Sequence, residues 1–271
     1  MGVTFGGTMS DTAQTRPVHA PPRARAPLVR RAGPWRFGPD EGAILAATAV
    51  VAVSAAFLLF PGVDIAVSRL FYRPEAGFVL SGDPVLKALR KSSTLVLALM
   101  LLGVLGRLVC AWGRRRPWGD AGRRALFVVS ALALGPGLTI NLVFKELWGR
   151  ARPIQIEAFG GDAVFTPVWM FSDACRSNCS FVSGEGAGAA WMVGAVLVLT
   201  PARWRTVIAP LAIAYAIALS MNRLAFGGHF LSDILLSWGL TAMVMLALHR
   251  VTFAARRLDR RRIWSVQALP A

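Results

Sequence analysis

The sequence predicts an all-α membrane protein, built as a polytopic bundle of six transmembrane helices with both termini in the cytoplasm. Its composition is the first sign, because 55% of the 271 residues are hydrophobic, whereas apolar residues make up about 45–50% of a typical soluble domain. The second sign is a set of six apolar runs, each long enough, or nearly so, to form a helix of roughly 20 residues that crosses the hydrocarbon core. The runs cover residues 43–61, 92–112, 125–144, 184–200, 206–222 and 230–249.

Boundary signals accompany several of the runs. The first run begins after Glu41 and ends at Pro61, too far from the N-terminus and too long for the apolar part of a signal peptide. Residues 84–91, just before the second run, form a possible amphipathic stretch at the interface. The fourth run is rich in Gly and Ala, which lets transmembrane helices approach closely. The predicted parts are a disordered, basic cytoplasmic N-terminus at 1–40, a six-helix membrane domain at 41–250 and a basic cytoplasmic tail at 251–271.

The distribution of arginine is the third observation, and it sets the topology. Arginine clusters occur in four segments that alternate with the runs, at 16–36, 114–124, 203–205 and 250–262. Because Lys and Arg concentrate on the cytoplasmic side of inner (plasma) membrane proteins, the loops at 62–91, 145–183 and 223–229 are expected to face the periplasm or outside. The net charge of +16 could also suit a nucleic-acid-binding protein, but apolar spans divide the single basic face that such binding needs.

Cationic side chains gather at the predicted outward helix ends. Lys145 ends the third run, Arg152 follows seven residues later, and Arg223 closes the fifth run. If the helix continues past Lys145, the spacing of seven places Arg152 on the same face two turns away. Ser183 and Gly184 open the fourth run, where free N–H groups and the helix dipole favour an anion. These groups together predict a phosphate site.

A histidine and an aspartate open the sixth run. His229 and Asp233 are spaced i and i+4, so on a helix the carboxylate can reach the imidazole, fix its tautomer and leave the other nitrogen free to attack. Taken singly, such residues have simpler interpretations: a basic residue anchors a span, Ser-Gly caps a helix, and a boundary histidine is structural. Their common outward position favours a catalytic site, because ionisable residues at membrane depth are functional candidates.

Two cysteines lie in the second outward loop. Cys175 and Cys179 are four residues apart, and a disulfide is plausible outside the cytoplasm. A metal pair is the alternative, but no histidine lies nearby to complete a zinc site. We expect no metal and no cofactor.

The motifs resemble those of the type 2 phosphatidic acid phosphatase family of membrane lipid phosphatases. Lys145-x6-Arg152-Pro153 matches the first motif, and Arg223-x5-His229-x3-Asp233 matches the third apart from Asn222, where Ser is usual. The resemblance covers about residues 90–250. It implies that His229 attacks phosphorus to form a phosphohistidine and that Asp233 orients His229. It also implies the groups that hold the phosphate oxygens, which are Lys145, Arg152, Ser183, Gly184 and Arg223.

The second motif departs from the family pattern. The family has Pro-Ser-Gly-His, whereas this chain reads Val182-Ser183-Gly184-Glu185. The family's histidine protonates the leaving oxygen, and Glu185 can do so only if its surroundings keep it protonated at the working pH. A substrate that needs little protonation, or a slow or inactive protein, would also fit this change. Glu185 as the general acid is the favoured hypothesis.

The favoured function is hydrolysis of a lipid phosphomonoester or diphosphate at the outer face of the inner membrane. Candidate substrates are lipid A, undecaprenyl phosphates, phosphatidylglycerol phosphate and phosphatidic acid. A lipid phosphotransferase of the same superfamily and a weakly catalytic lipid-phosphate binder are the alternatives. The partner is a lipid phosphate in the membrane rather than a nucleic acid, and the sequence does not define an oligomeric state.

Overall fold

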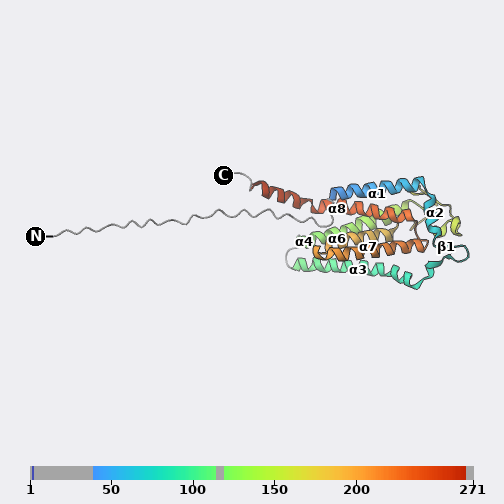
Figure 1. The fold of residues 1–271 in the computed structure, drawn as a ribbon, viewed down its shortest axis with the longest axis horizontal. Helices are drawn as coiled ribbons and strands as arrows, with labels where there is room; N and C mark the ends of the chain where they lie inside the picture. Colours follow the sequence, from blue (N-terminus) through green and yellow to red (C-terminus); the bar gives the residue numbers. More distant parts are fainter. Residues whose placement is uncertain (1, 3–38, 114–118, 267–271) are drawn as a thin grey trace. The chain divides into compact units, whose positions relative to one another are not determined.

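A computed structural model describes Gly2 and residues 39–113 and 119–266, with side chains up to residue 253 (Figure 1). Most of the predicted N-terminal segment, residues 114–118 of one arginine-rich loop, and residues 267–271 of the tail lie outside the described residues. The all-α prediction is confirmed, since a two-stranded hairpin is the whole of the described sheet structure.

Six helical stretches correspond to the six apolar runs. They are α1 (Pro39–Leu59), α3 (Pro84–Gly113), α4 (Asp120–Leu132) with its continuation, α6 (Gly184–Leu199), α7 (Ala202–Ala225) and α8 (Leu231–Val266). Five of them are long and apolar enough to cross a membrane. The fourth predicted span is the exception, because α6 has only 16 residues. The described residues therefore establish a multi-pass membrane protein with five candidate spans and one shorter apolar helix.

Two helices extend beyond the predicted apolar runs. The helix of the second run begins at Pro84 rather than at residue 92, so residues 84–91 form the first turns of α3. Pro84 suits a first helical position, and Asp83 Oδ1 accepts the Leu86 amide at 2.9 Å, as a helix cap does. At the other end of the chain, α8 continues past residue 249 to Val266.

The third run contains a π-helical segment. Helix α4 passes into η2 (Ala133–Phe144) and then α5 (Lys145–Leu147), which carries Lys145. Pro136 lies inside η2, and its carbonyl accepts the Asn141 side-chain amide at 2.8 Å. Proline removes a backbone donor and crowds the preceding turn, and wider π turns are common where a helix serves a functional site. This segment immediately precedes Lys145 and therefore sets its position at the end of the bundle.

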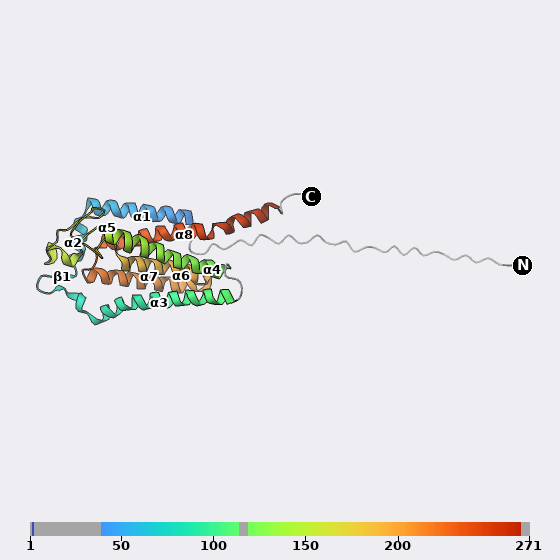
Figure 2. The ribbon, with the colours of Figure 1, turned by 180° about the vertical axis from the view of Figure 1, so that it is seen from behind.

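Helix α8 lies against α1, α6, α4 and η2, and α3 lies along α4 and α7 (Figures 1 and 2). The largest core cluster includes Phe127 and Val128 of α4 and Trp191 of α6, all at most 2% exposed. The Trp191 indole donates to the Val128 carbonyl at 3.0 Å. The short helix α6 is therefore fixed inside the bundle by its neighbours.

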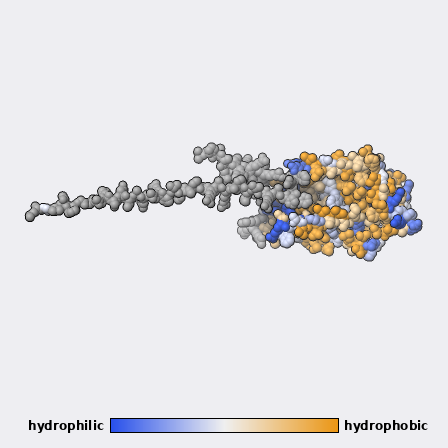
Figure 3. Space-filling model, in the orientation of Figure 1, coloured by the Kyte–Doolittle hydropathy of each residue, from blue (hydrophilic) through white to orange (hydrophobic). Residues whose placement is uncertain are grey.

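The outer surface of the bundle is apolar. Figure 3 shows hydrophobic residues over the middle of the visible face and hydrophilic residues toward its ends. Leu59, Leu95, Leu102 and Trp112 are each more than 60% exposed. A soluble monomer rarely exposes a continuous apolar surface of this kind to water, whereas in a membrane the surface contacts apolar lipid.

A layer of short elements covers one end of the bundle. It comprises α2 (Gly62–Arg69), the antiparallel strands β1 (Tyr72–Arg73) and β2 (Gly77–Phe78), η1 (Val79–Gly82), η3 (Pro153–Gln155) and η4 (Glu157–Phe159). We call residues 60–83 and 148–183 the loop layer. Its own apolar cluster joins Phe78, Phe159 and Phe230. Since Phe230 precedes α8, this cluster ties the loop layer to the helix ends that carry the candidate site.

Candidate active site

The predicted site residues come together beneath the loop layer. Lys145 lies at the end of η2, Arg223 in the last turn of α7, and His229 just before α8. Lys145, Arg152 and Arg223 are all close enough to His229 to act on its charge. Residues from three separate segments thus form one cationic cluster around an imidazole from a fourth.

His229 is held as a neutral base. Its ring is buried, and Nδ1 lies 2.8 Å from the Ser180 carbonyl oxygen. A carbonyl can only accept, so Nδ1 carries the proton and Nε2 keeps the lone pair. Burial, and then the charges of Arg223, Lys145 and Arg152, hold the pKa of His229 well below its usual 6.5. Near neutral pH, the imidazole therefore has an unprotonated nitrogen available for attack.

Asp233 does not contact His229 in the predicted way. Its Oδ2 lies 3.9 Å from His229 Nδ1 and instead accepts the Ser180 hydroxyl at 2.6 Å and the Phe230 amide at 2.9 Å. His229 precedes α8, so the two residues do not share a helix, and Ser180 contacts both of them. No sequence pattern indicated Ser180, because it belongs to a loop that is distant along the chain.

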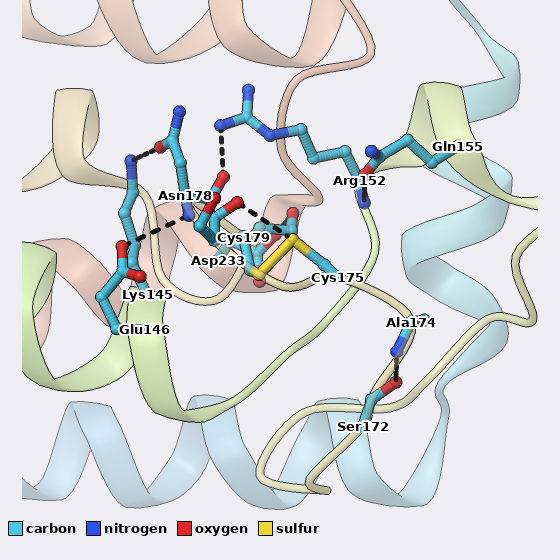
Figure 4. Close-up of a disulfide and its surroundings, with 12 residues drawn as sticks. Lys145, Glu146, Arg152, Gln155, Ser172, Ala174, Cys175, Asn178, Cys179 and Asp233 are labelled. Carbon is cyan, nitrogen blue, oxygen red and sulfur yellow. Dashed lines mark hydrogen bonds between the residues drawn. A yellow bond between two sulfur atoms is a disulfide. The ribbon is translucent and has the colours of Figure 1, made fainter.

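Arg152 reaches the site by another route than predicted. The helix ends at Leu147 instead of continuing to Arg152, and Arg152 has extended backbone with φ −81° and ψ 158°. Lys145 Nζ donates to the Asn178 side-chain oxygen at 3.0 Å, and Arg152 Nη2 donates to the Asn178 carbonyl at 2.7 Å (Figure 4). Asn178 therefore joins the two cations that the sequence placed on one helical face.

A disulfide pairs Cys175 with Cys179, with a Cα–Cα distance of 5.6 Å (Figure 4). Asn178 lies inside this small ring at φ 50°, a conformation that asparagine tolerates better than most residues. The Glu146 carboxylate accepts the Asn178 amide at 3.3 Å. Cysteines joined to each other are not metal ligands, and the described part of the chain holds no group of three or more His, Cys, Asp or Glu residues suited to a metal ion.

Glu185 lies between two guanidinium groups. Its Oε1 is 3.0 Å from Arg90 Nε, and its Oε2 is 3.2 Å from Arg223 Nε. The second contact is an ion pair without hydrogen-bond alignment, because Arg223 Nε has no hydrogen-bond partner although its side chain is only 4% exposed. Buried donors of this kind are rarely left unpaired. Sequence reasoning missed Arg90, since a basic residue near a span end resembles an ordinary anchor.

Ser183 and Gly184 form the start of α6. The Ser183 hydroxyl oxygen caps the helix by accepting the Gly186 amide at 3.1 Å. A Cβ at Gly184 would lie 2.4 Å from the Asn141 side-chain oxygen and 3.2 Å from Lys145 Nζ. Glycine is therefore required for Lys145 and Asn141 to lie this close to the amide end of the helix.

Gly149→Ala should destabilise the loop that carries Arg152. Gly149 has φ +65°, and an added Cβ would lie 1.7 Å from the Ser172 carbonyl oxygen. Left-handed backbone costs a non-glycine residue about 1–2 kcal/mol before any clash, so we expect a loss of at least about 2 kcal/mol and a lower Tm in detergent. Gly188→Ala in α6 is the control, because its Cβ would meet nothing within 4 Å. Equal Tm values for both variants would contradict this explanation.

Fold and site together define a membrane-embedded enzyme that acts on a phosphate ester, and the comparisons with known proteins agree. The PAP2 superfamily matches residues 124–257. Two curated relatives are lipid A 4'-phosphatases, from Rhizobium etli (34% identical, covering 74% of this chain and 83% of the relative) and Rhizobium leguminosarum (35%, 74% and 92%). A third relative, from Francisella tularensis subsp. novicida, has the same name (33%, 66% and 81%). The chain belongs to the PAP2 superfamily.

A solved structure agrees in fold. The transmembrane PAP2-type phosphatidylglycerolphosphate phosphatase of Bacillus subtilis superposes with a TM-score of 0.51 at 19% identity, covering 78% of this chain and 95% of that one. The curated relatives and the apolar helices together identify this protein as a membrane lipid phosphatase, as the motif resemblance implied.

Proposed function

We propose that this protein removes the 4'-phosphate of lipid A through a phosphohistidine at His229. The observation that carries the catalytic part is a buried imidazole whose Nδ1 lies 2.8 Å from the Ser180 carbonyl oxygen, with three cations around it. The substrate rests on the three curated relatives, all lipid A 4'-phosphatases. Since those matches extend over 81–92% of the relatives' lengths, a shared substrate is the simplest inference.

The first chemical step forms a bond between His229 Nε2 and phosphorus. The bond between phosphorus and the lipid oxygen breaks, and its electron pair leaves with that oxygen. Lys145, Arg152 and Arg223 stabilise the charge that develops on the phosphoryl oxygens, with the Ser183 hydroxyl and the Gly184 amide. Water then attacks the phosphohistidine, which releases phosphate and restores neutral His229.

The departing oxygen needs a proton, because a sugar alkoxide is a poor leaving group. Glu185 is the proposed donor, and in the second step its carboxylate takes a proton from the attacking water. An incoming phosphate competes with Glu185 for Arg223. Glu185 then keeps Arg90 as its guanidinium partner.

The topology is part of the proposal. Helix α6, the fourth of the predicted runs, is taken as a span as well, which brings the number of spans to six. Its 16 residues rise about 24 Å at 1.5 Å per residue, somewhat less than the roughly 30 Å hydrocarbon core. With six spans, the arginine-rich segments face the cytoplasm and the loop layer faces the periplasm. The site then opens on the face of the inner membrane where a lipid phosphate headgroup is available.

The function is tested by phosphate release from purified full-length protein in detergent. Lipid A with both phosphates, undecaprenyl phosphate, phosphatidylglycerol phosphate and phosphatidic acid form the substrate panel, and mass spectrometry of the lipid A product locates the phosphate that was lost. We expect preferential loss of the 4'-phosphate, with free phosphate appearing although no acceptor lipid is present. Preference for a glycerophospholipid, or phosphate transfer without release, would overturn the assignment.

Glu185→Gln should lower kcat on the lipid by roughly 10²-fold, because the amide cannot donate the required proton. The loss should be much smaller on p-nitrophenyl phosphate, whose leaving group needs no proton. Glu157→Gln, an exposed change in the loop layer, is the control and should keep wild-type activity. Wild-type turnover and an unchanged pH profile in Glu185→Gln would remove Glu185 from the acid role.

A further inference from the structure

We propose that Asp64 and Arg150 are positioning residues for the catalytic histidine, acting through Asp233 and Ser180. Asp64 lies outside the motifs that identify the family in this chain, and Arg150 occupies an unspecified position within the first motif, between Lys145 and Arg152. The inference rests on the proposed role of His229 but not on the identity of the lipid. It starts from a network of three charges, Asp64 and Arg150 of the loop layer and Asp233 of α8, whose side chains are at most 1% exposed.

Arg150 lies between two carboxylates. Its Nη1 is 2.6 Å from Asp233 Oδ1, and its Nη2 is 2.9 Å from Asp64 Oδ2. Its Nε donates to the Thr166 carbonyl at 2.7 Å, and the guanidinium lies over the Phe230 ring at 4.4 Å. The planar group is therefore fixed on every donor edge and on one face, which a lysine could not reproduce.

Asp64 reaches this network from α2, 86 residues before Arg150. Its Oδ1 accepts the Ser232 amide at 2.9 Å, and its Oδ2 accepts the Ser232 hydroxyl at 2.5 Å as well as Arg150. Ser232 immediately precedes Asp233 in the first turn of α8. One carboxylate thus fixes both the arginine that contacts Asp233 and the backbone that carries Asp233.

Ser180 links the network to His229. Its amide donates to the Arg150 carbonyl at 2.8 Å, its hydroxyl donates to Asp233 Oδ2 at 2.6 Å, and its carbonyl accepts His229 Nδ1. A displacement of Arg150 or Asp233 therefore moves the carbonyl that sets the histidine tautomer and the direction of Nε2. Misplacement of a reacting group by about 1 Å can cost roughly 10² in rate.

The network is not explained by stability alone. Burying three charges incurs a desolvation penalty that their mutual attraction often fails to exceed. The phosphate-binding cations have other fixed partners, because Lys145 and Arg152 are held by Asn178. Loss of Asp64 should therefore affect the attack by His229 and leave phosphate binding nearly intact.

The test is Asp64→Asn in the full-length enzyme, assayed on the lipid phosphate that the wild type hydrolyses best. We expect kcat to fall by about 10–100-fold, while KM and the inhibition constant of orthovanadate, a phosphate mimic, stay within about twofold. Ser232→Ala removes one hydroxyl from the same network and should give a smaller fall of the same kind in a folded protein. Arg150→Lys should also lower kcat, because a lysine cannot replace the planar guanidinium. Asp162→Asn, a change at an exposed residue, is the matched control.

Two results would overturn the proposal. One is a wild-type kcat for both Asp64→Asn and Ser232→Ala with only a lower Tm, which a purely structural network would give. The other is a parallel loss of vanadate inhibition and kcat, which would place Asp64 in phosphate binding. Every variant is compared with the wild type on the lipid that the wild type hydrolyses best. If that lipid is not lipid A, the assay lipid changes, but the ratios of variant to wild-type kcat can still be interpreted.

Discussion

His229→Ala should abolish phosphate release while leaving the protein folded. Nε2 of His229 is the atom that forms the bond to phosphorus in the proposed mechanism, and alanine offers no nucleophile. Loss of a covalent nucleophile typically costs far more than about a thousandfold in kcat. The cationic cluster does not depend on the imidazole for its contacts, so orthovanadate should still bind. Rapid-quench labelling with a radioactive phosphate donor should show a phosphoenzyme in the wild type alone.

The control for this variant is His249→Gln. His249 lies on the same helix, α8, with its ring 5.8 Å from that of Phe127 and away from the site. Activity of His249→Gln should resemble that of the wild type. A phosphoenzyme or measurable turnover in His229→Ala would show that another residue is the nucleophile.

The pH dependence of kcat/KM follows from the lowered pKa of His229. Protonation would remove the lone pair of Nε2, so activity is lost as pH falls through the pKa of the folded enzyme. Because burial and three cations hold that pKa well below 6.5, the acid limb that His229 sets in kcat/KM should lie below pH 6.5. The same sign applies to stability: a histidine buried in its neutral form destabilises the fold as pH falls below its unfolded pKa.

The sequence predicted the helices well, because apolar runs and arginine-rich loops report directly on the membrane. The end of the third helix was harder, since the pattern after Lys145 allowed another helical turn. Gly149 at φ +65° and its contact with Ser172 explain the stop, but that contact depends on a loop more than twenty residues away. Local periodicity contains no information about such a neighbour.

Some residues of the candidate site were predicted from the sequence and others were not. His229, Arg223 and the cations of the first motif were found because their spacing within one segment is distinctive. Ser180, Asp64 and Arg150 were missed because their roles arise from contacts between segments. The direct contact of His229 with Asp233 was expected from helix geometry, yet His229 precedes α8, and Ser180 contacts both residues, His229 through its carbonyl and Asp233 through its hydroxyl.

Arg223→Ala should lower kcat/KM by roughly 10²–10³-fold, the cost of removing one preorganised charged donor from a developing anion. Arg223 is 3% exposed, and its Nε finds no aligned acceptor in the phosphate-free protein. A phosphate oxygen would supply that acceptor, so the arginine gains an interaction when substrate binds. Gly228 permits this placement, since a Cβ there would lie 2.3 Å from Arg223 Nη2.

Arg223→Lys should recover little of this activity, because an ammonium lacks the planar fork and the reach of the guanidinium. Arg205→Ala is the control on the same helix, α7, where Arg205 Nε donates to the Thr200 carbonyl at 3.0 Å, near the opposite end from the site. Steady-state kinetics with orthovanadate inhibition separate the two contributions of Arg223. A loss shared by kcat/KM and vanadate binding indicates that Arg223 holds the phosphoryl group, whereas wild-type vanadate binding in Arg223→Ala would show that the arginine serves only to hold Glu185.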